Sequence, residues 1–241
     1  MNQSASQEMS ETGDQSFSDT RRTGGDSARP LAQSPVAEPL PTAFLLGIVL
    51  AGFALRLAYL LSSHPFIDEF TTILAARAIW QHGLPVLPSG LFYEHGLLFS
   101  YLDTAFVGLA PWLEPLAGEK ALFIAARLPS LLIATVTIPL LYRIGRQTVS
   151  PWAGLAAAAL LAFSPEGMVW GGRARMYALA QLLVLVLGFL VYEGSRGKGR
   201  ARLRWVALVA LLATLLTQFG AIILVPPVSY THLTLPTTPY V

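Results

Sequence analysis

Long runs of apolar residues dominate the chain from residue 42 onward. A helix rises ~1.5 Å per residue, so a run of about 20 apolar residues covers the ~30 Å hydrocarbon core of a bilayer. Five stretches meet or approach this length: 42–63, 121–142, 151–170, 176–192 and 205–225. The stretch 151–170 does so only if the proline at position 165 is tolerated inside it. The pattern predicts an all-α protein that crosses a membrane about five times.

The connection between the first two stretches, residues 64–120, has a mixed pattern. Apolar residues in 70–81 recur at three- and four-residue spacing, and Gly83 and Pro85 follow, so we expect a short helix at the membrane interface. Residues 97–112 are apolar but short, and they include a carboxylate. We therefore expect a second helix that lies along the membrane surface instead of crossing it.

Both ends of the chain depart from this pattern. Residues 1–41 are rich in Ser, Gln, Thr, Gly and Pro and show no helical or strand period, so we expect a disordered tail. The segment 228–241 is rich in Thr and Pro, and its start, VSYTHLTLPT, resembles the translation of a transposon-end sequencing adapter. The alternative is an ordinary external loop. The adapter interpretation makes 42–227 part of a longer transmembrane domain, which we expect to be inactive as this fragment.

Composition supports the membrane interpretation. Hydrophobic residues make up 54% of the chain and charged residues 12%, whereas soluble domains carry about 25% charged residues. The net charge of +2, without a basic groove, argues against nucleic acid as a partner. The absence of cysteine excludes disulfides, thiolate metal sites and cysteine nucleophiles.

The distribution of charge predicts the orientation in the membrane. Short loops rich in Lys and Arg stay in the cytoplasm. The loops 143–150 and 194–204 are both basic and are separated by two predicted spans, whereas 64–120 carries six acidic residues and two basic ones. We therefore expect a multi-pass protein of the cell membrane with a cytoplasmic N-terminus and an external 64–120 loop.

Asp68 and Glu69 are the first candidates for chemistry. Adjacent carboxylates at a membrane surface are costly to desolvate unless they are paired, bind a metal or transfer protons. One of them beside a hydroxyl acceptor would serve as a general base. The alternative is structural, since Asp68 suits the N-cap of the helix at 70–81 and Glu69 suits the positive end of that helix.

Four motifs follow one another along the chain: Asp-Glu after a span that holds an arginine, AARLPSLLIATVTIPLLYRIGRQ (125–147), SPWAGLAAAALLAFSP (150–165) and RARMYAL (173–179). In this order they resemble the protein O-mannosyltransferase and aminoarabinose-transferase group of the C-type glycosyltransferase superfamily. The resemblance covers about 55–190. It implies a C-type fold with external interfacial helices in the first loop.

The resemblance also implies roles for the acidic pair. Asp68 would deprotonate the acceptor nucleophile, which displaces polyprenyl phosphate from the donor sugar with inversion, and Glu69 would orient Asp68 or pair with a cation. The reaction would take place at the outer face of the membrane.

YEHG (93–96) stands where the resembled family often has Tyr-x-Glu-Lys-Pro-Pro. The resemblance gives Glu94 and His95 a place near the donor phosphate or a divalent metal. The family lysine is missing here, and a protonated histidine binds phosphate whereas a neutral one ligates metal. A metal cofactor therefore stays open.

Arginines supply the remaining candidates. Arg175 matches the family arginine and is expected to bind the phosphate leaving group with Tyr177 beside it, and the alternative is that both lie at the outer interface. Arg173 would face the same site only if the preceding glycines keep the segment non-helical. Arg56 is expected to pair with Asp68 or Glu69 in the substrate site, and Arg127 to have a structural role at the outer surface.

The sequence thus predicts a membrane glycosyltransferase that takes a sugar from a polyprenyl-phosphate donor to a lipid, glycan or protein acceptor. Two alternatives belong to other classes: a transporter or flippase of lipid-linked substrates, and a non-catalytic membrane subunit. Transporters usually place ionisable residues at the bilayer midplane, in repeated elements. No internal repeat is visible, which favours the enzyme.

Overall fold

A computed structural model describes residues 39–196 and 201–234. The described chain is helical apart from its connections and one isolated antiparallel bridge between Val86 and Phe92. The prediction of an all-α polytopic membrane protein is confirmed. The predictions for residues 1–38, and for 235–241 at the C-terminal end, lie outside the described residues.

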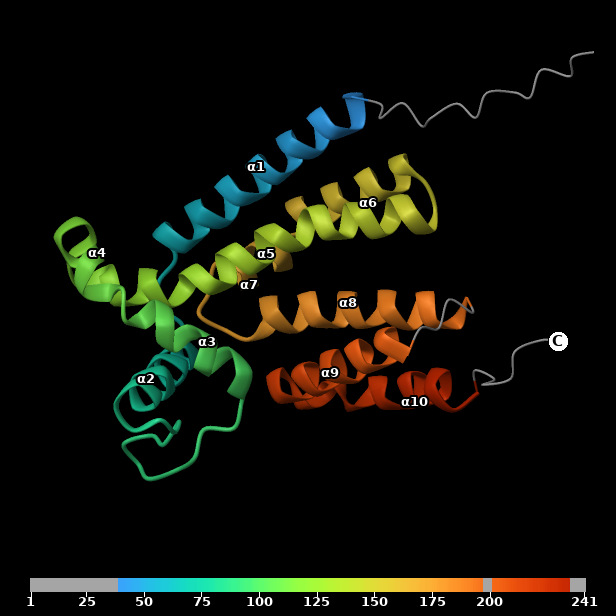
Figure 1. The fold of residues 1–241 in the computed structure, drawn as a ribbon. Coiled ribbons are helices and arrows are strands. Elements are labelled where there is room, and N and C mark those ends of the chain that lie inside the picture. Colours follow the sequence, from blue (N-terminus) through green and yellow to red (C-terminus); the bar gives the residue numbers. More distant parts are fainter. Residues whose placement is uncertain (1–38, 197–200, 235–241) are drawn as a thin grey trace, which may run out of the picture. The chain divides into compact units, whose positions relative to one another are not determined.

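In the part of the chain that the structure describes, three helices are long and apolar enough to cross a membrane. They are α1 (Pro39–Ser62), the continuous run of helices that ends in α5 (Ala121–Thr148), and α8 (Tyr177–Ser195). Figure 1 shows the three running side by side. The first, second and fourth predicted spans are therefore confirmed.

The third predicted span is broken. Helix α6 (Pro151–Phe163) and helix α7 (Pro165–Gly171) are bent by 61° at the residue between them. Proline has no N–H and clashes with the preceding turn, so it begins a new helix instead of continuing one. The hydroxyl of Ser164 accepts from the Gly167 N–H and caps the new start. The condition set for a continuous third span, that Pro165 is tolerated inside one helix, is therefore not met, and 151–170 is a span only as a bent pair.

The fifth predicted span is also wrong as a continuous helix. Helix α9 (Ala201–Thr217) ends at Gln218, after which the chain forms the 3-10 helix η2 (Phe219–Leu224) and helix α10 (Val225–Thr234). Within the described residues, three helices qualify as spans, or four if the bent pair α6–α7 counts as one. Val228 is buried against α8 and α9; the adapter origin of the segment it begins stays a prediction.

The loop between α1 and α5 folds into short helices. Helix α2 (Ile67–His82) contains the predicted 70–81 helix, α3 (Leu97–Val107) and α4 (Ala110–Ala117) divide the second apolar piece, and η1 (Gly118–Lys120) leads into α5. None of the first three is a membrane span by itself, as predicted. Figure 1 shows α2, α3 and α4 gathered at one end of the long helices.

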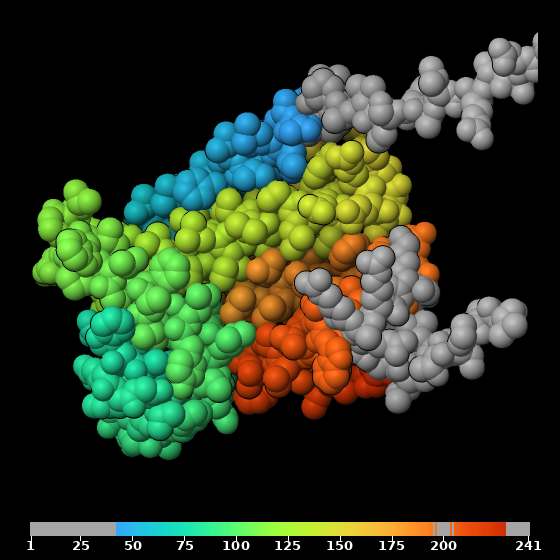
Figure 2. All heavy atoms as spheres, in the orientation of Figure 1, coloured from blue at the N-terminus to red at the C-terminus, as the bar shows by residue number. Residues whose placement is uncertain are grey.

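Helix α5 is the centre of the packing. It contacts α1, α3, α4, α6, α7 and α8, and Figure 2 shows α1 resting along it. The backbones of α5 and α6 touch where two glycines meet, because a Cβ on Gly154 would lie 2.5 Å from the Tyr142 carbonyl oxygen and one on Gly145 would lie 2.6 Å from the Gly154 Cα. Small residues permit such close approach of membrane helices.

Candidate active site

The first turn of α2 presents the acidic pair. The helix begins after Phe66, whose backbone is extended, so Asp68 and Glu69 both lie inside the first turn. The Glu69 carboxylate accepts a hydrogen bond from the Phe66 N–H at 2.8 Å, which is the reciprocal half of a capping box. The expected N-cap role of Asp68 is therefore wrong, and Glu69 caps the helix instead.

Glu69 is locked in a buried ion pair with Arg127 of α5. Arg127 Nε donates to Glu69 Oε1 at 2.8 Å and Nη2 donates to Oε2 at 2.7 Å. The Ala174 N–H donates to Oε1 at 2.8 Å. Both carboxylate oxygens are thus fully used, and the residue is buried. Burial alone raises the pKa of Glu69, but the hydrogen bonds from Arg127, Phe66 and Ala174 outweigh it and hold the pKa below its usual value.

The same arginine also forms hydrogen bonds with the backbone at the end of α1. Arg127 donates to the backbone carbonyls of Leu60, Ser63 and His64 at 2.8, 3.2 and 3.3 Å. Arg127 is buried and its guanidinium bonds only protein groups, which is a structural environment; its position under the outer surface of the membrane stays a prediction. Glu69 pairs with a cation, as one of its two expected roles requires, and this pair joins α1, α2, α5 and the segment before α8.

Asp68 faces a different partner. Its Oδ2 lies 3.4 Å from Arg175 Nη2, and its side chain is 46% exposed whereas that of Arg175 is 7% exposed. Arg175 belongs to the non-helical segment between α7 and α8. The pair therefore joins an accessible carboxylate to a buried guanidinium.

Arg175 is also held by polar groups that the sequence analysis did not select. Its Nη1 donates to the Tyr93 hydroxyl at 3.0 Å and lies 3.4 Å from the Thr72 hydroxyl. Tyr93 is the first residue of YEHG, and the tyrosine of the resembled family segment was the sequence signal for its role. The predicted site included only Glu94 and His95 from this segment. Arg175 Nε is buried without a hydrogen-bond partner, so the guanidinium keeps one donor unused.

Aromatic rings frame the two arginines of the segment before α8. Arg175 lies 5.6 Å from the ring centre of Tyr177, which places Tyr177 beside the site as expected. Arg173 turns elsewhere, 4.5 Å from the Phe66 ring, and donates to the Tyr59 hydroxyl at 3.1 Å. The non-helical segment thus directs its two arginines to different neighbours.

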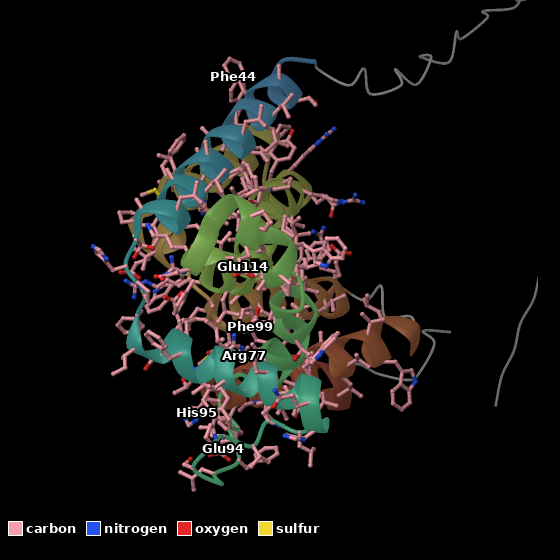
Figure 3. All side chains as sticks on the ribbon, turned by 90° about the vertical axis from the view of Figure 1, so that its left-hand side faces the viewer. Phe44, Arg77, Glu94, His95, Phe99 and Glu114 are labelled. Carbon is pink, nitrogen blue, oxygen red and sulfur yellow. The ribbon has the colours of Figure 1, made fainter. Side chains whose placement is uncertain are left out.

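Glu94 and His95 lie beside this cluster. The His95 ring is 6.2 Å from the ring of Tyr93, and both Glu94 and His95 line a small cavity of about 150 Å³ against the end of α9. Figure 3 shows both on the loop at the edge of this end of the molecule. Among the described residues, no third carboxylate or imidazole joins them in a metal-binding group, so the donor set for a metal is incomplete.

Arg56 has a structural environment. It is fully buried, and it donates to the carbonyls of Leu161 and Ala162 at 2.8 and 2.9 Å. Those carbonyls belong to the last turn of α6, where the proline break leaves them without helical partners. The expected pairing of Arg56 with Asp68 or Glu69 is therefore wrong.

Asp103 of α3 is an unexpected buried acid. It is fully buried, and neither carboxylate oxygen has a hydrogen-bond partner. Burial, and next the negative charge of Glu69, raise the pKa of Asp103 to about 8. The group is therefore protonated at neutral pH.

Fold and site together define a polytopic membrane protein in which a half-exposed carboxylate at the start of α2 pairs with a buried guanidinium from the segment between α7 and α8. The chain belongs to the dolichyl-phosphate-mannose-protein mannosyltransferase family, whose model matches residues 115–238, just over half of the chain. It is therefore a membrane glycosyltransferase by family. The match includes Arg127, Arg175 and Tyr177 and begins after the acidic pair. No curated protein and no solved structure matches the chain.

Proposed function

We propose that the protein transfers a sugar from a polyprenyl-phosphate donor to an acceptor at the outer face of the membrane, with Asp68 as the general base. The observation that carries this proposal is the 3.4 Å pair between the half-exposed Asp68 carboxylate and the buried Arg175 guanidinium. A general base must be ionised and reachable, and a phosphate leaving group needs a fixed cation.

The neighbouring residues support this division of roles. Asp68 is reachable from solvent, whereas both oxygens of Glu69 are occupied by Arg127 and backbone N–H groups. Asp68 is therefore the member of the acidic pair that is free to accept a proton, and Glu69 positions the turn that carries it.

In the proposed reaction, Asp68 accepts the proton of an acceptor hydroxyl. The hydroxyl oxygen bonds to the anomeric carbon from the side opposite the phosphate, and the bond between that carbon and the phosphate oxygen breaks. The configuration at the anomeric carbon inverts because the hydroxyl attacks from the side opposite the leaving phosphate. This single displacement needs one base and no covalent bond between the sugar and the enzyme. Arg175, whose Nη2 faces the accessible Asp68 carboxylate, stabilises the negative charge on the departing polyprenyl phosphate.

The test is transfer from radiolabelled polyprenyl-phosphate sugars by the full-length gene product in membranes. The Asp68→Asn variant keeps the shape of the side chain but cannot accept a proton, and we expect it to lose at least a hundredfold in kcat, in line with the ~10²–10⁴ contributed by a general base. Glu166→Gln, on a carboxylate that instead bonds the Trp170 indole, is the matched control and should keep its activity. Retained transfer by Asp68→Asn would remove Asp68 from the proposed role.

A further inference from the structure

A large cleft opens beside the second half of α2. Its volume is about 840 Å³, within the ~300–1,000 Å³ of ordinary ligand pockets. It is walled by α2, the junction of α3 and α4, and the start of α5. Figure 3 looks onto this end of the molecule and shows Arg77 and Glu114, two of the lining residues, on the face toward the viewer.

The cleft is separate from the site around Asp68. Asp68 and Arg77 are nine residues apart on α2. At ~100° and ~1.5 Å per residue, their side chains leave the helix on opposite sides, roughly 14 Å apart along its axis. Neither Asp68 nor Arg175 lines the cleft.

One wall of the cleft is aromatic. Trp80 is 69% exposed, and its Cζ3 would lie 3.6 Å from a Cβ at Gly108. The edge of the indole thus rests on backbone while most of the ring system stays open to a ligand. An exposed indole offers a flat apolar surface, on which the apolar face of a sugar ring can stack.

The other walls hold donors and acceptors that have no partner. In the described part of the chain, no hydrogen bond or ion pair engages the side chains of Arg77, Gln81 and Glu114. Their groups both donate and accept, as sugar hydroxyls require. With Glu119 also lining the cleft, its carboxylates outnumber its one cation, which disfavours a phosphate or another anion.

We infer that this cleft binds a neutral glycan chain, stacked on Trp80 and hydrogen-bonded by Arg77, Gln81 and Glu114. In a glycosyltransferase that acts at this face, the glycan would be part of the acceptor. That acceptor role rests on the proposed function, whereas glycan binding does not.

The test is saturation-transfer-difference NMR on the detergent-solubilised chain with mannotriose, cellotriose or chitotriose. We expect ring-proton signals from at least one trisaccharide, and at least a fivefold loss of affinity in Trp80→Ala and in Arg77→Ala. Trp112→Ala is the matched control: Trp112 is 81% exposed on α4 but does not line the cleft, so this variant should bind as the parent does. Thermal unfolding of each variant checks that it folds.

Three results would overturn the inference. One is the absence of binding by all three trisaccharides to folded protein. Another is an equal loss in the Trp80 and Trp112 variants, and the third is binding of inorganic phosphate or phosphatidylglycerol vesicles that Trp80→Ala abolishes. Asp68→Asn should bind the trisaccharide unchanged, so that retained transfer by this variant, with trisaccharide binding intact, counts against the proposed function alone.

Discussion

At the scale of single residues, two neighbouring carboxylates meet opposite surroundings. Glu69 is buried with both oxygens bonded to Arg127 and to backbone N–H groups, whereas Asp68 is half-exposed. Removing one member of a buried ion pair leaves an uncompensated charge and costs about 3–5 kcal/mol. We expect Glu69→Gln and Arg127→Met each to lower the free energy of unfolding by about this amount, measured by thermal unfolding in detergent.

The double variant Glu69→Gln/Arg127→Met separates pairing from side-chain loss. It should be more stable than the Glu69→Gln single variant, because no unpaired buried charge remains. Asp68→Asn is the control in the adjacent position and should change stability by less than about 1 kcal/mol, as expected for a pair with an exposed member. Additive losses in the double variant would show that the two residues are not coupled.

Asp103 predicts a pH dependence of stability. Its pKa is raised from 3.8 to about 8 in the folded chain, so between these values the folded state holds a proton that the unfolded state has released. Stability must therefore fall as pH rises from about 4 to about 8. We expect Asp103→Asn to remove this part of the slope, so that its stability relative to the parent increases from pH 5 to pH 8.

The comparison between variant and parent at each pH cancels the titration of the other groups, including Glu69, whose pKa shift acts in the opposite sense. Thermal unfolding at several pH values in one detergent supplies the measurement. If the difference in the free energy of unfolding between Asp103→Asn and the parent is the same at pH 5 and at pH 8, Asp103 does not hold its proton in the folded state.

At the scale of elements, the contact between α5 and α6 depends on two glycines. A Cβ on Gly154 would lie 2.5 Å from a backbone oxygen of α5, so Gly154→Ala must push the helices apart. We expect it to destabilise the chain by about 1–3 kcal/mol. Gly47→Ala in α1 is the matched control, since nothing lies within 4 Å of its Cβ, and there alanine should stabilise by up to about 1 kcal/mol. Equal unfolding temperatures for the two variants would contradict the close contact.

The elements were predictable where one local signal dominates. The length of the apolar runs predicted α1, α5 and α8. The three- and four-residue spacing of apolar residues, followed by Gly83, predicted α2. Pro165 was named in advance as the residue that could break the third span. The break at Gln218 was missed, because apolar residues continue on both sides of it. Arg56 was misassigned for a related reason. Its partners are carbonyls of the last turn of α6, and only the fold shows that this turn ends beside α1.

At the scale of the whole molecule, the site combines residues distant in sequence. The structure brings Asp68 and Arg175 within 3.4 Å of each other, and both lie at span ends that the charge pattern predicts to be on the same side; their shared role in a site stays a prediction. The Glu69–Arg127 pair and the buried Asp103 were not assigned, since each depends on how α2, α3 and α5 pack. The cleft at Trp80 has no sequence motif, because its lining residues come from α2, the junction of α3 and α4, and the start of α5.

The distribution of charge predicts the orientation of the chain in the membrane, and this prediction can be tested directly because the protein has no cysteine. Single cysteines at Ser89, exposed in the loop after α2, and at Gln147, exposed at the basic end of α5, should sit on opposite sides of the bilayer. Basic loops remain in the cytoplasm. A membrane-impermeant thiol reagent on intact cells should therefore label Ser89→Cys and leave Gln147→Cys unlabelled until the cells are permeabilised. The reverse pattern would place Asp68 on the cytoplasmic side, and the proposed reaction would have to draw its donor and acceptor from that side.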